Sequence, residues 1–249
     1  MSKHSEACCR IPPVVVEGYQ PKGKYIDLDG IKTYVTGPAD ANKAILSVYD
    51  IFGFFPQTLQ GADILAESDT ERKYQVFLPD FFAGNPAKLE WYPPDDDGKK
   101  AKLGAWFGNA VWPIHMPKVP GLLKAAETVN TNITSWGIIG YCWGGKMASL
   151  LAGQDPGLFK AAVQTSPARI DAGDATNIKI PTMILASEEE PEAEIRKFEA
   201  NLKVAKHIEM FSDQLHGFMS ARADLKDAKV KAEYERGYKL ALGFFHEHL

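Results

Sequence analysis

Cysteine is scarce in this sequence. The 249 residues include three cysteines, Cys8, Cys9 and Cys142. An odd number with two adjacent members does not suggest a disulfide framework, and no further Cys or His pair has the spacing of a zinc site. We therefore expect free thiols, with Cys8 and Cys9 as an exposed pair, and neither a metal nor a cofactor.

Long apolar runs and an excess of basic residues are also missing. The first thirty residues contain no apolar run longer than 14–16, and no segment approaches the roughly 18 apolar residues of a membrane span. The formal net charge is -4 and the sequence pI is about 5.9. This balance argues against nucleic acid or a membrane as the main partner. We expect a soluble, cytoplasmic protein, monomeric or homodimeric, that acts on a small molecule.

Apolar residues are plentiful enough for a full core, at 45% of the sequence. Apolar runs typical of buried strands alternate with helical patterns, and this alternation predicts βαβ units. The predicted strands cover 44–49, 74–78, 137–141, 159–163, 182–186 and 207–211, and the predicted helices cover 59–66, 121–129, 192–202 and 228–248. The sequence predicts one α/β domain over 1–249, with a mostly parallel central sheet, helices on both faces and an irregular arm at 1–23.

Two stretches depart from the alternation. An Asp-Gly pair at 29–30 separates 25–28 from 31–35 and is a two-residue hairpin signal. After Pro79 comes a long, irregular insertion rich in aromatic residues, which contains the charge run 95–102. We expect the charge run to be a solvated loop. The tryptophans of the insertion either belong to the ordinary core or form the roof of a pocket.

One stretch concentrates the chemistry of the chain. A strand-like run at 137–141 leads into Cys142, and a helical pattern follows. Gly140 and Gly144 flank Cys142 in the frame of a G-x-S-x-G nucleophile elbow, with cysteine in place of serine. The amide of Trp143 and the helix N-terminus would stabilise a thiolate or an oxyanion there. Cys142 is therefore either an exposed nucleophile or a buried structural cysteine.

A cysteine hydrolase also needs a base and a carboxylate that orients the base. In an α/β-hydrolase arrangement the acid and then the histidine follow the nucleophile, each after a later strand. Here the strand at 182–186 ends in three consecutive glutamates, 188–190, and His216 lies just past the strand at 207–211. Alternatively, His216 is a loop histidine bonded to backbone, and the glutamates are a solvated run. Surface positions are expected for the remaining histidines, which are His4, His115, His207, His246 and His248.

Four motifs in this order resemble the dienelactone hydrolase family. They are 49–53 (YDIFG), 78–82 (LPDFF), 140–145 (GYCWGG) and 216–218 (HGF). The similarity runs from about residue 23 to the end of the sequence. It implies an α/β-hydrolase fold and a Cys-His-Asp triad that opens enol-lactones and related esters without a metal or cofactor. It makes Cys142 the nucleophile and His216 its base, and it makes Ile51 and Trp143 the amide donors of the oxyanion hole.

The triad acid and the residue before Ile51 depart from the family pattern. Counting from Pro181 brings Glu190 to the place of the family aspartate, with Glu189 as an alternative. Where the family often has a glutamate that interacts with the resting thiol, this chain has Asp50. Asp50 either keeps a looser contact with the thiol or caps the next turn.

The residues expected to bind the substrate also differ from the family pattern. The resemblance implies two arginines that hold the carboxylate of dienelactone, but Gly84 occupies the first position, and the nearest arginine after His216 is the displaced Arg222. We therefore expect a larger or more apolar ester or lactone, hydrolysed through a thioester acyl-enzyme. The alternatives are a non-catalytic α/β-hydrolase scaffold used for binding, and a flavodoxin-like cysteine amidotransferase.

Overall fold

The structure, a computed structural model, describes residues 11–154 and 157–249. The strands are β1 (Lys24–Leu28), β2 (Ile31–Thr36), β3 (Lys43–Val48), β4 (Tyr74–Pro79), β5 (Ser135–Tyr141), β6 (Ala161–Thr165), β7 (Thr182–Ser187) and β8 (Lys206–Phe211). The α-helices are α1 (Pro56–Glu67), α2 (Asp97–Phe107), α3 (Trp112–His115), α4 (Val119–Val129), α5 (Trp143–Gln154), α6 (Glu192–Asn201) and α7 (Ala228–His248). Short 3-10 helices are η1 (Leu89–Trp91), η2 (Met116–Lys118) and η3 (Asp174–Thr176). Each predicted strand and helix overlaps an observed one.

The eight strands form one sheet in the order β1-β2-β4-β3-β5-β6-β7-β8. Neighbouring strands from β4 to β8 pair in parallel, whereas β1 and β2 are antiparallel. The predicted hairpin is confirmed, because Asp29 and Gly30 both have positive φ values, 54° and 76°, as a type I′ turn requires. Parallel pairing brings the carboxyl ends of β3, β5, β6, β7 and β8 to one edge of the sheet.

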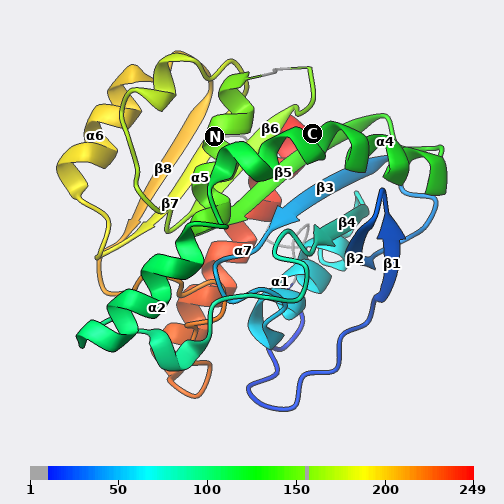
Figure 1. The fold of residues 1–249 in the computed structure, drawn as a ribbon. Helices are drawn as coiled ribbons and strands as arrows, with labels where there is room; N and C mark the ends of the chain where they lie inside the picture. Colours follow the sequence, from blue (N-terminus) through cyan, green and yellow to red (C-terminus); the bar gives the residue numbers. More distant parts are fainter. Residues whose placement is uncertain (1–10, 155–156) are drawn as a thin grey trace.

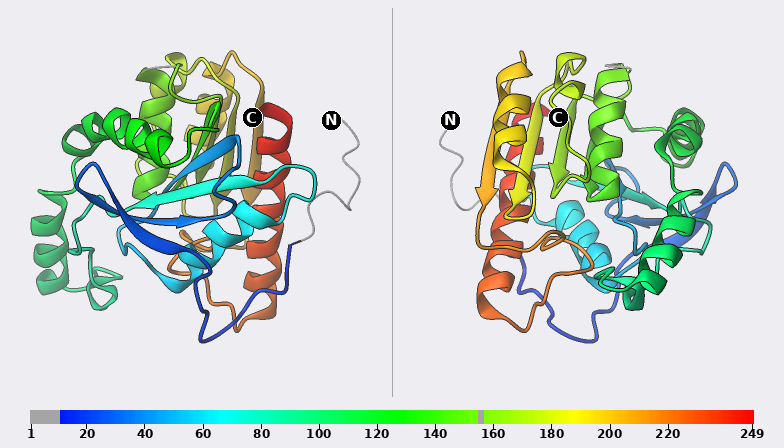
Figure 2. Two further views of the ribbon diagram at one scale, coloured as in Figure 1. Left: turned by 90° about the vertical axis from the view of Figure 1, so that its right-hand side faces the viewer. Right: turned by 60° about the vertical axis from the view of Figure 1, so that its left-hand side comes forward.

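Helices cover both faces of the sheet, as predicted. Helices α1 and α7 lie together on one face, and α4, α5 and α6 lie on the opposite face (Figures 1 and 2). The parallel strands read as continuous apolar runs because both of their faces are covered: every residue of β4, β6 and β7 is buried. The edge of the sheet formed by the carboxyl ends of the parallel strands is therefore the expected place for a binding or active site.

The insertion after β4 contains more regular structure than expected. The charge run at 95–102, predicted to be a solvated loop, instead forms much of helix α2. Asp96 caps this helix by accepting a hydrogen bond from the amide of Lys99 at 2.7 Å, which satisfies one of the free amides of the first turn. The helix buries Leu103 alone. In Figure 1, α2 lies beyond the carboxyl ends of the parallel strands.

The amino-terminal arm has no helix or strand over residues 11–23. It is attached to helix α1 by hydrogen bonds to Asp63, whose carboxylate accepts from the Tyr19 hydroxyl at 2.5 Å and from the Lys22 amide at 3.0 Å. Cys8 and Cys9, expected to be an exposed pair, lie outside the described residues. Within the described ranges, no helix is long and apolar enough to cross a membrane.

Candidate active site

Cys142 occupies the sharp turn between β5 and α5, as the elbow frame predicts. It has a φ of 53°, a left-handed conformation that is strained for any residue except glycine. The turn is possible because its neighbours lack side chains: a Cβ on Gly140 would lie 1.9 Å from the Gly144 carbonyl oxygen, and one on Gly144 would lie 2.0 Å from that of Val48. The Cys142 side chain is half-buried. The strained turn therefore presents a partly accessible thiol at the carboxyl edge of the sheet.

His216 connects Cys142 to a buried carboxylate. Its Nδ1 lies 2.6 Å from Oε1 of Glu190, and His216 lines the same cavity as Cys142, whose side chain acts on the imidazole. The side chain of Glu190 is 4% exposed, and its Oε2 accepts a hydrogen bond from the Ser187 amide at 2.5 Å. Both carboxylate oxygens are thus engaged, and Glu190 fixes the imidazole in one orientation toward the sulfur.

The other two glutamates of the run take different positions. Glu188 is exposed, and Glu189 is exposed as well. Glu189 Oε1 accepts from the backbone amide of His216 at 3.1 Å and pairs with Arg222 at 3.2 Å. Arg222 also donates to the His216 carbonyl at 2.8 Å. Glu189 and Arg222 therefore hold the backbone of His216, whereas Glu190 contacts its ring.

The electrostatic surroundings of His216 favour its protonated form. Burial lowers the pKa of the imidazole, but the charge of a Cys142 thiolate, the hydrogen bond to Cys142 and the contact with Glu190 outweigh burial and raise the pKa to about 11. The surroundings therefore favour a positive charge on His216, beside the cavity that Cys142 also lines. An imidazolium next to a thiol is what a cysteine nucleophile requires.

Two backbone amides are available as oxyanion donors. Neither the Ile51 amide, after β3, nor the Trp143 amide, at the start of α5, donates to another of the described residues. A residue in the first turn of a helix has no carbonyl partner within that helix. Both residues line the same cavity as Cys142. The N-terminus of α5 adds a favourable dipole for a negatively charged oxygen.

The cavity beside Cys142 has a volume of about 250 Å³ and mainly apolar walls. Its lining residues are Asp50, Ile51, Phe52, Tyr92, Leu103, Phe107, Trp112, Cys142, Trp143, Ala168, Arg169, His216, Gly217 and Arg222. The insertion supplies Tyr92, Leu103, Phe107 and Trp112, and its Trp112 ring is nearly parallel to the Trp143 ring, at 16°. Of the two sequence alternatives for the insertion's tryptophans, the pocket roof therefore holds for Trp112.

Several cavity residues were not singled out from the sequence. Tyr92, Leu103, Phe107 and Arg169 carry no motif, and they meet Cys142 only through tertiary structure. The aromatic richness of the insertion was the signal that could have pointed to Tyr92 and Phe107. Nothing in the sequence around Arg169 distinguishes it from a surface arginine.

Asp50 and Arg222, both expected near the thiol or the substrate, do line this cavity. The carboxylate of Asp50 accepts hydrogen bonds from the amides of Phe52 at 2.8 Å and Ala221 at 3.0 Å. Arg222 lies over the Tyr92 ring, 4.7 Å from its centroid, in addition to its contacts with Glu189 and the His216 carbonyl. Both side chains are therefore bound to protein groups on the wall of the cavity.

Two of the histidines expected at the surface are buried, and that expectation was wrong for them. His115 packs edge-on against Trp143, and its Nε2 lies 3.0 Å from the Asn109 carbonyl oxygen. His246 Nδ1 lies 2.7 Å from Asp69 Oδ2, at the amino end of the sheet. Burial lowers the pKa of His115, so it is neutral and serves packing. The residues that these histidines contact, Trp143 for His115 and Asp69 for His246, are distant in the sequence.

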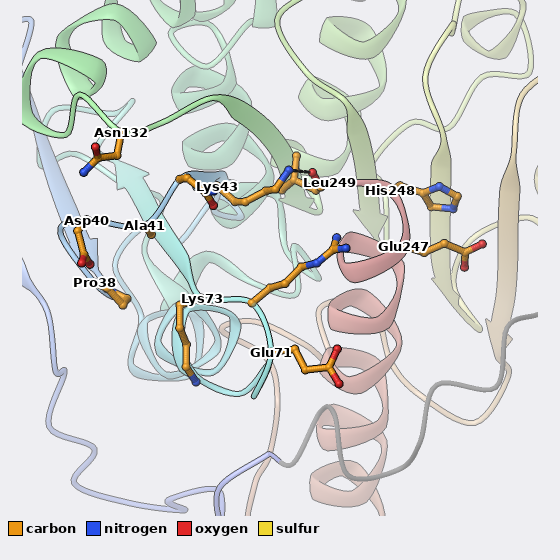
Figure 3. A pocket seen from close by; sticks show the side chains of 12 residues that line it. Pro38, Asp40, Ala41, Lys43, Glu71, Lys73, Asn132, Glu247, His248 and Leu249 are labelled. Atoms are coloured by element: carbon orange, nitrogen blue, oxygen red, sulfur yellow. Dashed lines mark hydrogen bonds between the residues drawn. The ribbon is translucent and has the colours of Figure 1, made fainter.

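A second and larger hollow lies at the opposite edge of the sheet, where the parallel strands begin (Figure 3). It has a volume of about 970 Å³ and is lined by side chains of both charges, including Lys43, Lys73, Glu71 and Glu247. Lys43 contacts the carbonyl oxygen of Leu249. This hollow contains no cysteine, and its charges are mixed, so the smaller cavity beside Cys142 is the candidate active site. Within the described ranges, no three His, Cys, Asp or Glu side chains are grouped so that they could hold a metal ion.

An eight-stranded, mostly parallel sheet with a strained cysteine between β5 and α5 defines an α/β-hydrolase fold. The model of the dienelactone hydrolase family matches residues 31–249. The chain therefore belongs to the dienelactone hydrolase family, and it is an ester or lactone hydrolase.

Relatives of known sequence align over most of the chain. An uncharacterized AIM2 family protein of Schizosaccharomyces pombe is 30% identical over 237 residues, which cover 92% of each chain. A carboxymethylenebutenolidase homolog of Mus musculus is 29% identical over 215 residues, which cover 83% of each. Among solved structures, a putative dienelactone hydrolase from Klebsiella pneumoniae superposes with a TM-score of 0.70 at 18% identity, over 91% of this chain and 98% of that one. That structural likeness shows the shared fold.

Proposed function

We propose that this protein cleaves an ester or lactone through a Cys142-His216-Glu190 triad and a thioester acyl-enzyme. The observation that carries the proposal is the position of His216 between the thiol and a buried carboxylate, 2.6 Å from Glu190 Oε1. The two amides of Ile51 and Trp143 lie on the same cavity without another described partner. A nucleophile, an oriented base and an oxyanion site together are what acyl transfer requires.

The reaction starts from the ion pair of Cys142 and His216. The thiolate attacks the substrate carbonyl carbon, and the resulting tetrahedral oxyanion accepts hydrogen bonds from the two amides. The imidazolium gives its proton to the departing alcohol or enol oxygen, which leaves a thioester on Cys142. Neutral His216 then takes a proton from water, and the hydroxide adds to the thioester carbon. Collapse of this second tetrahedral intermediate breaks the C–S bond, releases the carboxylic acid and returns the Cys142 thiolate beside the imidazolium. Glu190 keeps the imidazole in the orientation and protonation state that each step needs.

The leaving group decides which esters suit this site. A thiolate departs from a tetrahedral intermediate more readily than an alkoxide, so the intermediate of an alkyl ester returns to substrate. An enol or phenol ester releases an oxygen anion that conjugation stabilises, and its intermediate proceeds forward. The apolar walls formed by Phe107 and Trp112 and the volume of about 250 Å³ favour a compact, apolar or aromatic ester or lactone. Of the two substrate types expected from the sequence, larger or more apolar, these walls favour the more apolar one.

The test uses p-nitrophenyl acetate on protein in which Cys8 and Cys9 are replaced by serine. We expect a burst of p-nitrophenol and an acetyl group on Cys142, detected by intact-mass measurement after an acid quench. Cys142→Ala should lose both, and His216→Asn should lower kcat/KM by about 10³-fold or more. The matched control is His246→Asn, which removes a second buried histidine with a carboxylate partner at 2.7 Å.

Two results would contradict the proposal. A rate that survives Cys142→Ala would exclude the thiol as nucleophile, and equal losses in His216→Asn and His246→Asn would point to a folding effect. Comparable rates on p-nitrophenyl acetate and ethyl acetate would contradict the leaving-group argument. A folded protein without Cys142-dependent turnover on any activated ester would favour the scaffold alternative.

A further inference from the structure

Asp50 is a fully buried carboxylate in a wall of the active-site cavity. It lies two residues after the end of β3, is 2% exposed, and lines the cavity together with Cys142 and His216. Buried carboxylates are costly unless their oxygens are bonded. Packing alone therefore does not explain why a carboxylate is buried beside the proposed nucleophile and base.

The carboxylate of Asp50 joins two loops that carry different parts of the proposed machinery. Oδ1 accepts from the Phe52 amide at 2.8 Å and so shapes the loop whose Ile51 lines the cavity. Oδ2 accepts from the Ala221 amide at 3.0 Å, on the segment that follows His216. Because one rigid group bonds to both loops, the distance between the Ile51 amide and His216 depends on Asp50.

The segment after His216 has a second anchor that does not involve Asp50. The Tyr238 hydroxyl of α7 donates to the Met219 carbonyl at 2.9 Å and contacts the Tyr141 hydroxyl at 3.0 Å. All three groups are buried. The segment is therefore held to the core from α7, and loss of one hydrogen bond to Asp50 should shift its position without unfolding it.

The charge of Asp50 also acts on His216. Burial raises the pKa of Asp50 above its ordinary value, and the hydrogen bonds from Ser220 and from the amides of Phe52 and Ala221, together with the positive charge of His216, offset this rise only in part. Attraction between two charges is mutual, so an ionised Asp50 favours the imidazolium. The other groups that face the His216 ring are Cys142 and Glu190, and the Glu189-Arg222 pair faces its backbone.

We propose that Asp50 is a positioning residue that fixes the oxyanion loop against the histidine loop and whose charge favours protonation of His216. The proposal rests on the proposed function. Its charge effect is clearest in the acyl-enzyme, because the acylated sulfur of Cys142 is neutral. Glu190 and Asp50 are then the carboxylates that set the protonation of the base.

The test is the pH profile of kcat for p-nitrophenyl acetate under conditions in which deacylation limits turnover. Deacylation needs neutral His216, so kcat rises with pH, and the midpoint reports protonation of His216 in the acyl-enzyme. Asp50→Asn keeps the shape of the side chain and removes its charge. We expect kcat to fall about tenfold with little change in KM, and the midpoint to move to lower pH by about one unit.

The matched control is Asp69→Asn at the opposite edge of the sheet. Asp69 is also fully buried, accepts from the amides of Glu71 and Arg72, both at 2.9 Å, and faces His246. Its loss should cost stability as much as loss of Asp50, while the midpoint stays at the wild-type pH. Folding of each variant is checked by circular dichroism and thermal melting. If Asp50→Asn does not fold, Asp50→Ser removes the charge and leaves room for a water between the two amides.

A midpoint that stays at the wild-type pH in the folded, uncharged variant would overturn the proposal, even if kcat falls, because a merely structural residue does not move the profile. An equal shift in Asp69→Asn would also overturn it. Failure of the proposed function looks different. In that case wild-type protein forms no acyl-enzyme on Cys142, whereas the inference about Asp50 fails alone when wild-type protein acylates and turns over normally.

Discussion

Replacement of Glu190 by glutamine is the sharpest test of the acid in the proposed triad. Glutamine keeps the length of the side chain but has one oxygen for two donors, Nδ1 of His216 at 2.6 Å and the Ser187 amide at 2.5 Å. Its NH₂ group must then face one of these donors. The imidazole of His216 would no longer be held in one orientation. Its protonated form would also lose the stabilisation that the negative charge of Glu190 provides.

The size of the effect follows from the burial of the pair. The Glu190 side chain is 4% exposed, so solvent does not take over the lost interaction. Replacing the acid of a comparable triad by its amide lowers kcat by about 10⁴-fold, mainly through the wrong tautomer. A cysteine nucleophile depends less on its base, so we expect about 10³-fold in kcat/KM, or about 4 kcal/mol of transition-state stabilisation.

Glu189→Gln is the control, because Glu189 precedes Glu190 on the same loop. Glu189 is exposed and contacts the backbone of His216 and Arg222. Its amide oxygen can still accept from the His216 amide, so we expect less than about threefold loss. The assay is steady-state hydrolysis of p-nitrophenyl acetate, with melting temperatures for both variants. A larger loss in Glu189→Gln than in Glu190→Gln would refute the assignment of Glu190.

Three further predictions concern the elbow, the cavity wall and the far edge of the sheet. Gly144→Ala places a Cβ 2.0 Å from a backbone oxygen of β3 and should cost about 3 kcal/mol in urea unfolding, whereas Gly243→Ala, with nothing within 4 Å, should gain about 0.5 kcal/mol. Trp112→Ala removes an aromatic wall and a 2.9 Å hydrogen bond to the Trp143 carbonyl, and should raise KM for an aryl ester about tenfold. Burial raises the pKa of Asp69, but hydrogen bonds from His246 and two amides lower it below 3.8. The stability from this lowered pKa is present above 3.8 and lost as the pH falls through the folded-state value, so the melting-temperature gap between wild type and His246→Asn should narrow below about pH 4.

The order of strands and helices could be predicted from the sequence because a buried parallel sheet leaves a direct pattern. Apolar runs of five or six residues separated by helical patterns are typical of βαβ units and of few other folds. The elbow was equally clear, since Gly140 and Gly144 are the positions where a side chain would strike backbone. In each case the signal lies within a short window of sequence.

Helix α2 was missed because its signal is of another kind. It buries only Leu103 and has almost no apolar face, so periodicity could not reveal it. Its start is fixed by local contacts, the Asp96 cap and an ion pair between Lys99 and Asp95 at 2.8 Å. Its end is anchored by Trp106, which donates to the Asn85 carbonyl at 2.8 Å and packs against Phe82. The aspartates that looked like a solvated run are the start signal of a helix.

The buried histidines show a second limit of the sequence. His246 contacts Asp69, and the two are 177 positions apart. Neither residue lies in a motif, so their pairing follows from how α7 packs across the amino end of the sheet. The three glutamates after β7 also cannot be told apart by a local pattern. Glu190 contacts the His216 ring, Glu189 contacts the His216 backbone, and Glu188 is exposed to solvent. The count from Pro181 predicted Glu190 with Glu189 as an alternative, and the geometry shows that it is Glu190 that contacts the His216 ring.

The two arginines of the cavity bear on which substrate the site accepts. The Arg222 guanidinium already contacts Glu189, the His216 carbonyl and the Tyr92 ring, so an incoming carboxylate would compete with three existing partners. Arg169 is exposed and lies 5.9 Å from the Trp112 ring, where solvent screens its charge. Neither guanidinium offers a carboxylate the buried, unshared ion pair that would make recognition strong. The apolar walls therefore remain the main source of selectivity, which supports an uncharged, compact ester or lactone as the proposed substrate.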